Sequence, residues 1–284
     1  MPPLPYPFDR CWSTADAIPL ACLLEASAPK LGNVHPAAAF SDMQFSHFAG
    51  AAIALRNGFQ NYASHPVGQI VLTAVQAMRE QVGRNTSLGT ILLLAPLAKG
   101  VMQEGTLESL QAAVGGELEG LTPDDSRQVY EAIRLAAPGG LGQRSTEDVA
   151  GDAPPNLVAA MRQVAGVDAV ARQYATGFAD IFERLLPWFN EELNRHADPL
   201  AAIVELQLRW LAHEPDGLIV RKLGMVVAGE VQRLAQQILA SEGEQREAAV
   251  TALDRFLRED GHRRNPGTTA DLIAATVFVR LILP

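Results

Sequence analysis

The stretch VGQIVLTAVQAM, residues 67–78, sets its apolar side chains at the spacing of one helix face. These side chains recur at intervals of three and four residues: Val67, Ile70, Val71, Ala74, Val75 and Met78. The same spacing recurs just upstream, in Phe45, Phe48, Ala49, Ala52 and Ile53. Strict alternation of apolar and polar residues, the pattern of a strand, is scarce along the chain. The sequence therefore predicts an all-α fold.

Further helices are predicted from apolar spacing and from capping residues. Thr14 is predicted to cap a helix that runs to about Ala28. Thr122, followed by a proline and two aspartates, is typical of a helix start, and this helix should end before Pro138. The most apolar run, residues 88–98, is about half the length of a bilayer span and predicts a buried core helix. The other predicted helices cover 155–165, 168–192, 199–213, 218–240, 244–260 and 268–282.

Composition limits the classes of protein to which the chain can belong. With 48% hydrophobic residues over 284 positions, it can bury a full core, and we expect one multi-helix domain over 1–284 with a long loop at 139–155. The net charge of −9 disfavours nucleic acid and anionic membranes as partners. Cys11 and Cys22 are too few for a disulfide scaffold. We expect a cytoplasmic protein, and the oligomeric state is left open, a homo-oligomer included.

Common catalytic signatures are missing, and polar residues gather instead in turns beside predicted helices. The glycine-rich segment 139–142 lacks the Lys-Ser/Thr of a P-loop and predicts a turn. Four polar turns lie at 29–35 with 41–43, at 83–89, at 214–222 and at 263–271. Each combines Gly or Pro with charged or amide groups before a helix N-terminus, where free N–H groups favour phosphate. Any one of them is also typical of a capped turn between helices.

Several of these turns match one known family in order along the chain. Residues 28–35, APKLGNVH, resemble the P-K-P-G-x-V segment of the triphosphoribosyl-dephospho-CoA synthase family, and 42–43 resemble its D-M pair. Residues 85–89, NTSLG, resemble its N-T-H-K-G turn, and 215–224 resemble its G-D-T-N-x-x-x-R-G-G segment. Residues 266–272, PGTTADL, are similar to its S-P-G-G-S-A-D-L. The resemblance covers nearly the whole chain.

The sequence departs from the family pattern at informative positions. Ser87 and Leu88 replace a His-Lys pair, Leu218 replaces an Asn, and Lys222 replaces an Arg. These differences indicate a divergent, archaeal-type branch. The resemblance implies an ATP-dependent transferase that moves the triphosphoribosyl group of ATP to the ribose 2′-hydroxyl of 3′-dephospho-CoA and releases adenine. It also implies that Mg²⁺ accompanies ATP. Two alternatives stay open: a related enzyme acting on another phosphorylated cofactor precursor, in archaeal-type one-carbon metabolism, and a non-catalytic helical nucleotide-binding protein.

Site residues are carried over from the matching positions. Asp42, Asp216 and Asp271 are the predicted catalytic carboxylates, and the first two are the predicted Mg²⁺ ligands. The predicted substrate-binding residues are Lys30, Gly32, Asn33, His35, Asn85, Thr86, Arg221 and Lys222. Lys30, Asn85 and Asp216 are expected to converge on one pocket.

Structural roles are open for three of the polar positions. Asp271 lies near a predicted helix start and could serve only to stabilise that helix. Glu25 could form a simple ion pair with Lys30, and His35 could be a hydrogen-bonded structural residue.

Overall fold

The computed structural model describes residues 4–101, 105–137 and 151–283. Within these ranges the chain forms fourteen α-helices and one π-helical segment, and no strand. Extended backbone pairs only in an isolated bridge between His35 and Ala38, again among the described residues. The predicted all-α class is confirmed. The predicted loop falls largely on residues 139–150, which lie outside the described ranges, as does the glycine-rich segment 139–142.

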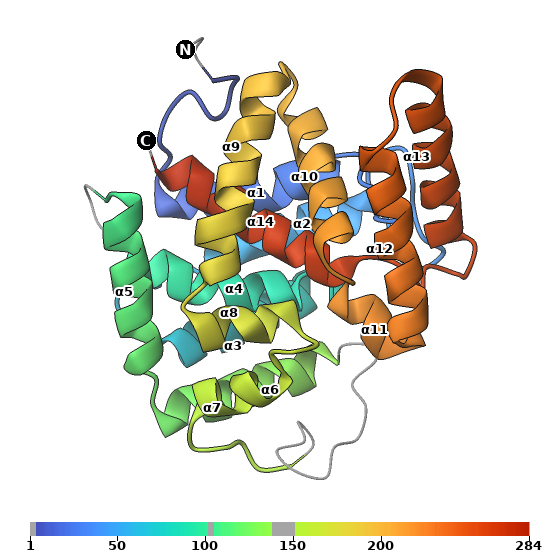
Figure 1. The fold of residues 1–284 in the computed structure, drawn as a ribbon. Coiled ribbons are helices and arrows are strands. Elements are labelled where there is room, and N and C mark those ends of the chain that lie inside the picture. Colours follow the sequence, from blue (N-terminus) through green and yellow to red (C-terminus); the bar gives the residue numbers. More distant parts are fainter. Residues whose placement is uncertain (1–3, 102–104, 138–150, 284) are drawn as a thin grey trace.

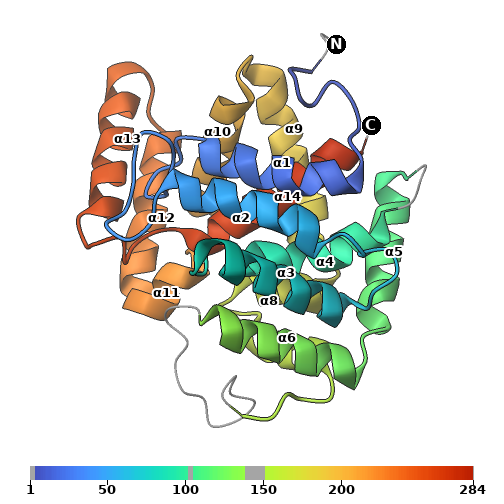
Figure 2. The same cartoon turned by 180° about the vertical axis from the view of Figure 1, so that it is seen from behind.

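Four helices stack side by side at the back of the molecule, each against the next (Figure 2). Two helices run through the interior, and three more cover the front, where α9 and α10 form a hairpin (Figure 1). The back layer consists of α1 (Thr14–Ser27), α2 (Phe45–Gly58), α3 (Val67–Val82) and α6 (Pro123–Ala136). The interior helices are α4 (Leu88–Gly100) and α14 (Gly267–Ile282), and the front helices are α8 (Ala169–Thr176), α9 (Leu186–Arg195) and α10 (Pro199–His213).

The remaining helices flank this core. They are α5 (Leu107–Glu119), α7 (Leu157–Val164), α11 (Gly217–Leu223), α12 (Met225–Leu239) and α13 (Gly243–Arg258). A second, smaller core joins α10, α11, α12 and α13, and Leu31 from the loop after α1 packs into it. The second core thereby ties the α11–α13 unit to the N-terminal loop.

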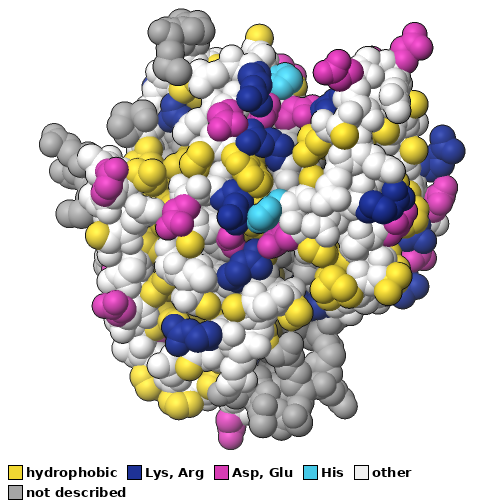
Figure 3. All heavy atoms as spheres, viewed as in Figure 1, with side chains coloured by type: hydrophobic (Ala, Val, Ile, Leu, Met, Phe, Trp, Pro, Cys, Tyr) yellow, Lys and Arg dark blue, Asp and Glu magenta, His cyan; other side chains and the backbone are white. Residues whose placement is uncertain are grey.

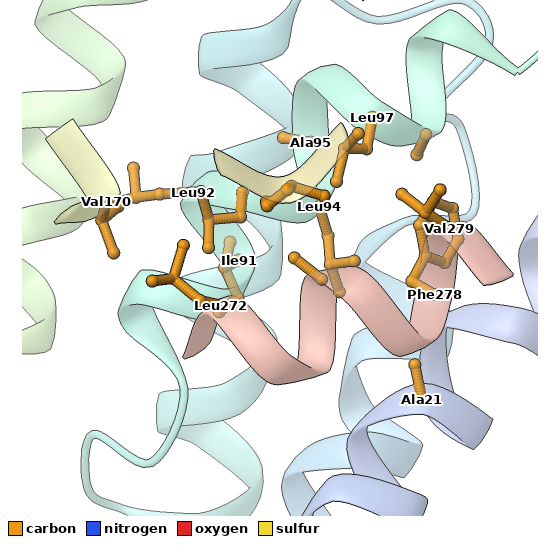
Figure 4. Close-up of a cluster of buried hydrophobic side chains, with 14 of the residues drawn as sticks. Ala21, Ile91, Leu92, Leu94, Ala95, Leu97, Val170, Leu272, Phe278 and Val279 are labelled. Atoms are coloured by element: carbon orange, nitrogen blue, oxygen red, sulfur yellow. The ribbon is translucent and has the colours of Figure 1, made fainter. Parts of the chain in front are cut away.

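The interior helices α4 and α14 are apolar on nearly every side. Leu272 and Phe278 of α14 lie among Ile91 and Leu94 of α4, with Val170 of α8 nearby (Figure 4). The prediction of a buried core helix at 88–98 is confirmed. Within the described ranges, none of the helices has both the length and the apolar content that a membrane span requires. Because both interior helices are packed along their lengths, their first turns are held rigidly, and those turns carry polar side chains.

Several helix boundaries differ from the predicted ones. Ser13, and not Thr14, caps α1, and α5 was not predicted. The predicted helix 168–192 is interrupted after α8, where Gly177 and Phe178 both adopt φ of 66° before the π-helical segment Asp180–Leu185. The predicted helix 218–240 is broken into α11 and α12 at Gly224, whose φ of 85° no helix accommodates.

Candidate active site

A cavity of about 930 Å³ opens where the back layer, the interior helices and the α11–α13 unit meet. One end is polar and is formed by the loops at 40–43, 84–87 and 261–267 together with α11. The other end is aliphatic and is formed by α6, α7 and α8, at the bottom of Figure 1. The N-terminal parts of α4 and α14 lie in the wall, where they contribute Thr90 and Asp271.

Asp271 is held in the wall by the N-terminus of another helix. Its Oδ1 accepts hydrogen bonds from the backbone N of Thr90 at 2.8 Å and from Thr90 Oγ1 at 2.7 Å. An N–H in the first turn of a helix has no partner in its own helix, so Asp271 caps α4 from α14. Among the described residues Oδ2 accepts no hydrogen bond, and it lies so close to Gly89 that a Cβ there would be 2.1 Å away.

The environment of Asp271 makes its carboxyl a weak acid. Burial raises its pKa to about 7, the hydrogen bonds from Thr90 oppose that rise, and the nearby charge of Glu25 adds to it. A carboxyl with such a pKa exchanges a proton readily near neutral pH. Asp271 is therefore suited to general acid–base chemistry, in addition to its capping of α4.

Glu25 and Cys22 of α1 lie in the same part of the wall. Glu25 pairs with Lys30 at 2.8 Å, and the Lys30 ammonium also donates to the Glu25 carbonyl. Lys30 is fully buried and does not line the cavity, so the structure supports an ion pair at the position predicted to bind phosphate. Burial raises the pKa of the Cys22 thiol far above its usual range, which leaves it protonated and unreactive.

Asp216 also lies behind the wall and outside the lining. Its Oδ1 accepts from the backbone N–H groups of Leu218 and Ile219, and its Oδ2 accepts from the N and Oγ1 of Thr269. The side chain caps α11 and ties it to α14, and its burial raises its pKa. The structure thus does not bring Asp216 and Lys30 into the pocket where Asn85 lies.

The polar end of the cavity carries an exposed carboxylate among cations. Asp42 lines the cavity, its carbonyl accepts from Arg84, and its carboxylate lies 4.0 Å from Arg84 and 3.7 Å from His262. His262 stacks on Phe40 with ring centroids 4.0 Å apart. Arg79 of α3 also lines the cavity, with no ion pair among the described residues. This end offers positive charge, one accessible carboxylate and an aromatic surface.

Arg221 and Lys222 of α11 line the cavity as predicted. Arg221 pairs with Asp168, which caps α8, and Lys222 Nζ donates to Asn265 Oδ1 at 3.1 Å. Burial lowers the pKa of Lys222, while Asp216 and Asp42 oppose that fall. These hydrogen bonds orient both cations within the wall.

Asn85 and Thr86 line the cavity in the turn before α4. Asn85 Oδ1 accepts from the backbone N of Leu88 at 3.1 Å, so it helps to satisfy the first turn of α4. Its amide nitrogen stays available to a ligand, since no hydrogen bond within the described chain uses it.

The loop at 29–35 is fixed by the second core. Gly32 has φ of 71°, its N donates to Asp254, and a Cβ there would meet Leu257 at 2.7 Å. Asn33 lines the cavity while its Oδ1 accepts from Gln207. Gly32 and His35 do not line it, and burial and the nearby Arg258 lower the pKa of His35. Gly32 therefore shapes the loop, and Asn33 is the residue that this loop presents to a ligand.

Seven of the predicted site residues thus line one cavity: Asn33, Asp42, Asn85, Thr86, Arg221, Lys222 and Asp271. Lys30, Gly32, His35 and Asp216 do not. Sequence reasoning missed Thr90, Arg79, Asp168 and His262, because each is brought to the wall by packing between distant helices. The only sequence feature that could have indicated Thr90 is the polar turn at 83–89, directly before α4.

The front face holds a second gathering of charges, over α8–α10 (Figure 3). Ion pairs neutralise it: Arg172 contacts Asp180 at 2.7 Å and Glu214 at 2.6 Å, and Arg209 contacts Glu192 at 2.7 Å. Such pairs connect helices and leave little net charge for a ligand, so the cavity remains the candidate site.

The donor set fits a metal ion only if a substrate completes its shell. The described residues contain no cluster of three or more His, Cys, Asp or Glu side chains placed to hold a metal. Mg²⁺ commonly uses one or two carboxylates together with substrate phosphates. Asp42 meets that requirement, whereas both oxygens of Asp216 are engaged by helix N-termini.

Comparison with known proteins assigns the chain to a family. The family model described as ATP:dephospho-CoA triphosphoribosyl transferase matches residues 11–283. The chain belongs to this family. A Vibrio cholerae relative, named a probable 2-(5''-triphosphoribosyl)-3'-dephosphocoenzyme-A synthase, is 29% identical over 280 residues, which cover 91% of this chain and 84% of that protein. A 2-(5''-triphosphoribosyl)-3'-dephosphocoenzyme-A synthase of Pectobacterium atrosepticum is 30% identical over 39% of this chain and 36% of its own.

A solved structure agrees with the family assignment. The crystal structure of a candidate triphosphoribosyl-dephospho-CoA synthase from Archaeoglobus fulgidus matches with a TM-score of 0.64 and 29% identity, and covers 83% of this chain and 97% of its own. The triphosphoribosyl transferase family, the transferase class and the all-α fold expected from the resemblance are confirmed.

Proposed function

We propose that this family member transfers the triphosphoribosyl group of ATP to the ribose 2′-hydroxyl of 3′-dephospho-CoA, with release of adenine. The observation that carries this reaction is the placement of Asp271. Its carboxylate, with a pKa of about 7, lies in the cavity wall at the first turn of α4. A cationic end for phosphates lies on the same cavity.

The reaction exchanges one bond at C1′ of the ATP ribose for another. The bond from C1′ to N9 of adenine breaks, and a bond from C1′ to the acceptor 2′-oxygen forms. The hydroxyl proton passes to Asp271 Oδ2, and adenine takes up one proton from solvent as it leaves. Asp271 then returns its proton to solvent, so that no proton is gained or lost overall. Charge at C1′ becomes positive in the transition state, so the carboxylates of Asp271 and Glu25 in the adjacent wall favour it.

The polar end of the cavity binds the triphosphate in this proposal. Arg79, Arg84, Arg221 and Lys222 supply countercharge and hydrogen-bond donors. Mg²⁺ bound to ATP would neutralise part of the triphosphate charge, and Asp42 is the residue that would hold it. Asn33 and Asn85 add amide groups that bind ribose or phosphate oxygens without changing the net charge.

The test is to incubate the protein with ATP, MgCl₂ and dephospho-CoA and to follow free adenine by chromatography. We expect adenine to appear in a one-to-one ratio with a product heavier than dephospho-CoA by one triphosphoribosyl group. Asp271→Asn should lower release by about 10²- to 10⁴-fold, and Asp124→Asn, which changes an exposed carboxylate on α6, should leave it intact. Binding of Mg·ATP without adenine release would refute the proposal and favour a non-catalytic nucleotide-binding protein. Release only with another phosphorylated acceptor would favour the related enzyme.

A further inference from the structure

We propose that the aliphatic end of the cavity binds the pantetheine arm of the acceptor, an assignment that rests on the proposed function. We call this end the aliphatic lobe, and define it by the aliphatic cavity residues of α6, α7 and the start of α8: Ile133, Ala136, Ala160, Met161, Val164, Val167, Val170 and Ala171. Asp168, the residue that caps α8, also lines the cavity beside them, where it is paired with Arg221. Val167 is 42% exposed although it is apolar, so the lobe opens to solvent.

The chemistry of the lobe matches the arm and not a phosphate. Pantetheine carries a gem-dimethyl group, two amides and a thiol, and it has no charge at neutral pH. The residues that define the lobe are uncharged and aliphatic, and Arg221 beside it is already paired with Asp168. A triphosphate placed there would therefore lose its solvation without a free counterion. Gln163 of α7 lines the cavity at an exposed position, and its side chain makes no hydrogen bond within the described chain. Its primary amide can pair with an amide of the arm.

A purine ring fits the opposite end better. Bases stack on aromatic rings or on Arg guanidinium planes, and the polar end supplies the parallel Phe40–His262 pair. Tyr130 is the one aromatic side chain of α6 in the wall, and it is 5% exposed and therefore offers little ring surface. The lobe is shaped for an aliphatic chain.

The lobe is continuous with the catalytic centre. Leu92 lines the cavity between Thr90 and the lobe, and it lies beside Val170 and Leu272 (Figure 4). Dephospho-CoA carries its reactive 2′-hydroxyl on the adenosine ribose, and a pyrophosphate separates that ribose from the arm. An acceptor with its ribose at Asp271 can therefore extend its arm past Leu92 into the lobe.

The test fills the lobe without touching the polar end. Val164→Phe adds a ring to a partly exposed lobe residue, and Ala159→Phe adds the same ring to an exposed position of α7 outside the cavity. Steady-state rates of adenine release, with both substrates varied, give separate KM values for ATP and dephospho-CoA. We expect Val164→Phe to raise the KM for dephospho-CoA at least tenfold and to change the KM for ATP less than twofold. Ala159→Phe should change neither.

Direct binding separates this assignment from the proposed reaction. ADP is dephospho-CoA without the arm, so we expect calorimetric titration of the wild-type protein to show tighter binding of dephospho-CoA than of ADP. Val164→Phe should remove that difference, and the milder Val164→Ala should reduce it. Equal affinities in the wild-type protein, or a Val164→Phe effect on ATP instead, would overturn the assignment. If the protein binds dephospho-CoA more tightly than ADP but releases no adenine, the proposed reaction is refuted and the assignment of the lobe to the pantetheine arm stands.

Discussion

Replacing Asp271 by Asn separates its catalytic role from its structural one. Asn keeps the size of the side chain, and its carbonyl oxygen can still accept both hydrogen bonds from Thr90. The change removes only the ionisable oxygen at Gly89. We expect adenine release to fall by about 10²- to 10⁴-fold, the usual contribution of a general base.

The stability of Asp271→Asn relative to the wild-type protein should increase as the pH rises. The folded protein holds the Asp271 proton to about pH 7, whereas the unfolded chain releases it near 3.8. An elevated carboxyl pKa therefore costs the wild-type protein stability as the pH rises between these two values. Two pKa units at 1.36 kcal/mol each amount to at most about 3 kcal/mol between pH 5 and pH 8. Asn does not titrate, so its stability relative to the wild-type protein should improve by up to that amount.

Urea unfolding of both proteins at pH 5 and pH 8, followed by circular dichroism, measures the difference. Asp216→Asn is the matched control, because each oxygen of Asp216 accepts two hydrogen bonds, and the amide NH₂ that replaces one oxygen cannot accept the two on its side. It should lose about 1–3 kcal/mol already at pH 5. If the stability difference between Asp271→Asn and the wild-type protein is the same at pH 5 and pH 8, Asp271 does not titrate in this range and the assignment of a titrating base is refuted.

Three further substitutions test the wall around this carboxylate. Gly89→Ala should reduce kcat by about 10²-fold, because a Cβ 2.1 Å from Asp271 Oδ2 forces the carboxylate to move; a kcat within twofold of wild type would contradict this. Asp42→Asn should leave the melting temperature unchanged, since its side chain is 67% exposed, and calorimetry should show Mg·ATP binding weakened at least tenfold, about 1.4 kcal/mol; unchanged affinity would exclude it as a ligand. Glu25→Gln should cost about 3–5 kcal/mol in urea unfolding by leaving Lys30 buried without a counterion, and Lys30→Met in that background should recover much of it.

Local features of the fold could be predicted from the sequence because they depend on near neighbours. Thr122 caps α6 with the predicted geometry, and the turns before α4 and α14, together with α11 itself, reach the cavity wall. Breaks inside helices were missed because the apolar spacing continues across them. Gly224 interrupts the pattern by its φ alone, and the periodicity on either side gave no sign of it.

The orientation of the polar side chains in these turns could not be predicted. Lys30 and Asp216 lie in turns that border the cavity, yet both side chains point into protein, where Glu25 and Thr269 satisfy them. A motif places a residue near a site, but the helices packed behind the turn decide whether its side chain points into the cavity or into the protein. Those helices are distant in sequence: Thr269 lies 53 residues from Asp216.

Asp216 and Asp271 link three helices through two successive helix caps, and the second cap holds the carboxylate whose Oδ2 is the proposed base. Asp216 at the start of α11 accepts from the N and Oγ1 of Thr269 in α14, and Asp271 in α14 accepts from the N and Oγ1 of Thr90 in α4. The two carboxylates differ in their second oxygen, since that of Asp216 is used by its own helix and that of Asp271 faces Gly89. Both oxygens of Asp216 therefore accept hydrogen bonds within the described chain, whereas only one oxygen of Asp271 does. Because α14 connects them, we expect that displacing Asp216 shifts the carboxylate of Asp271 as well. We therefore predict that Asp216 is a positioning residue that influences the proposed reaction without touching a substrate.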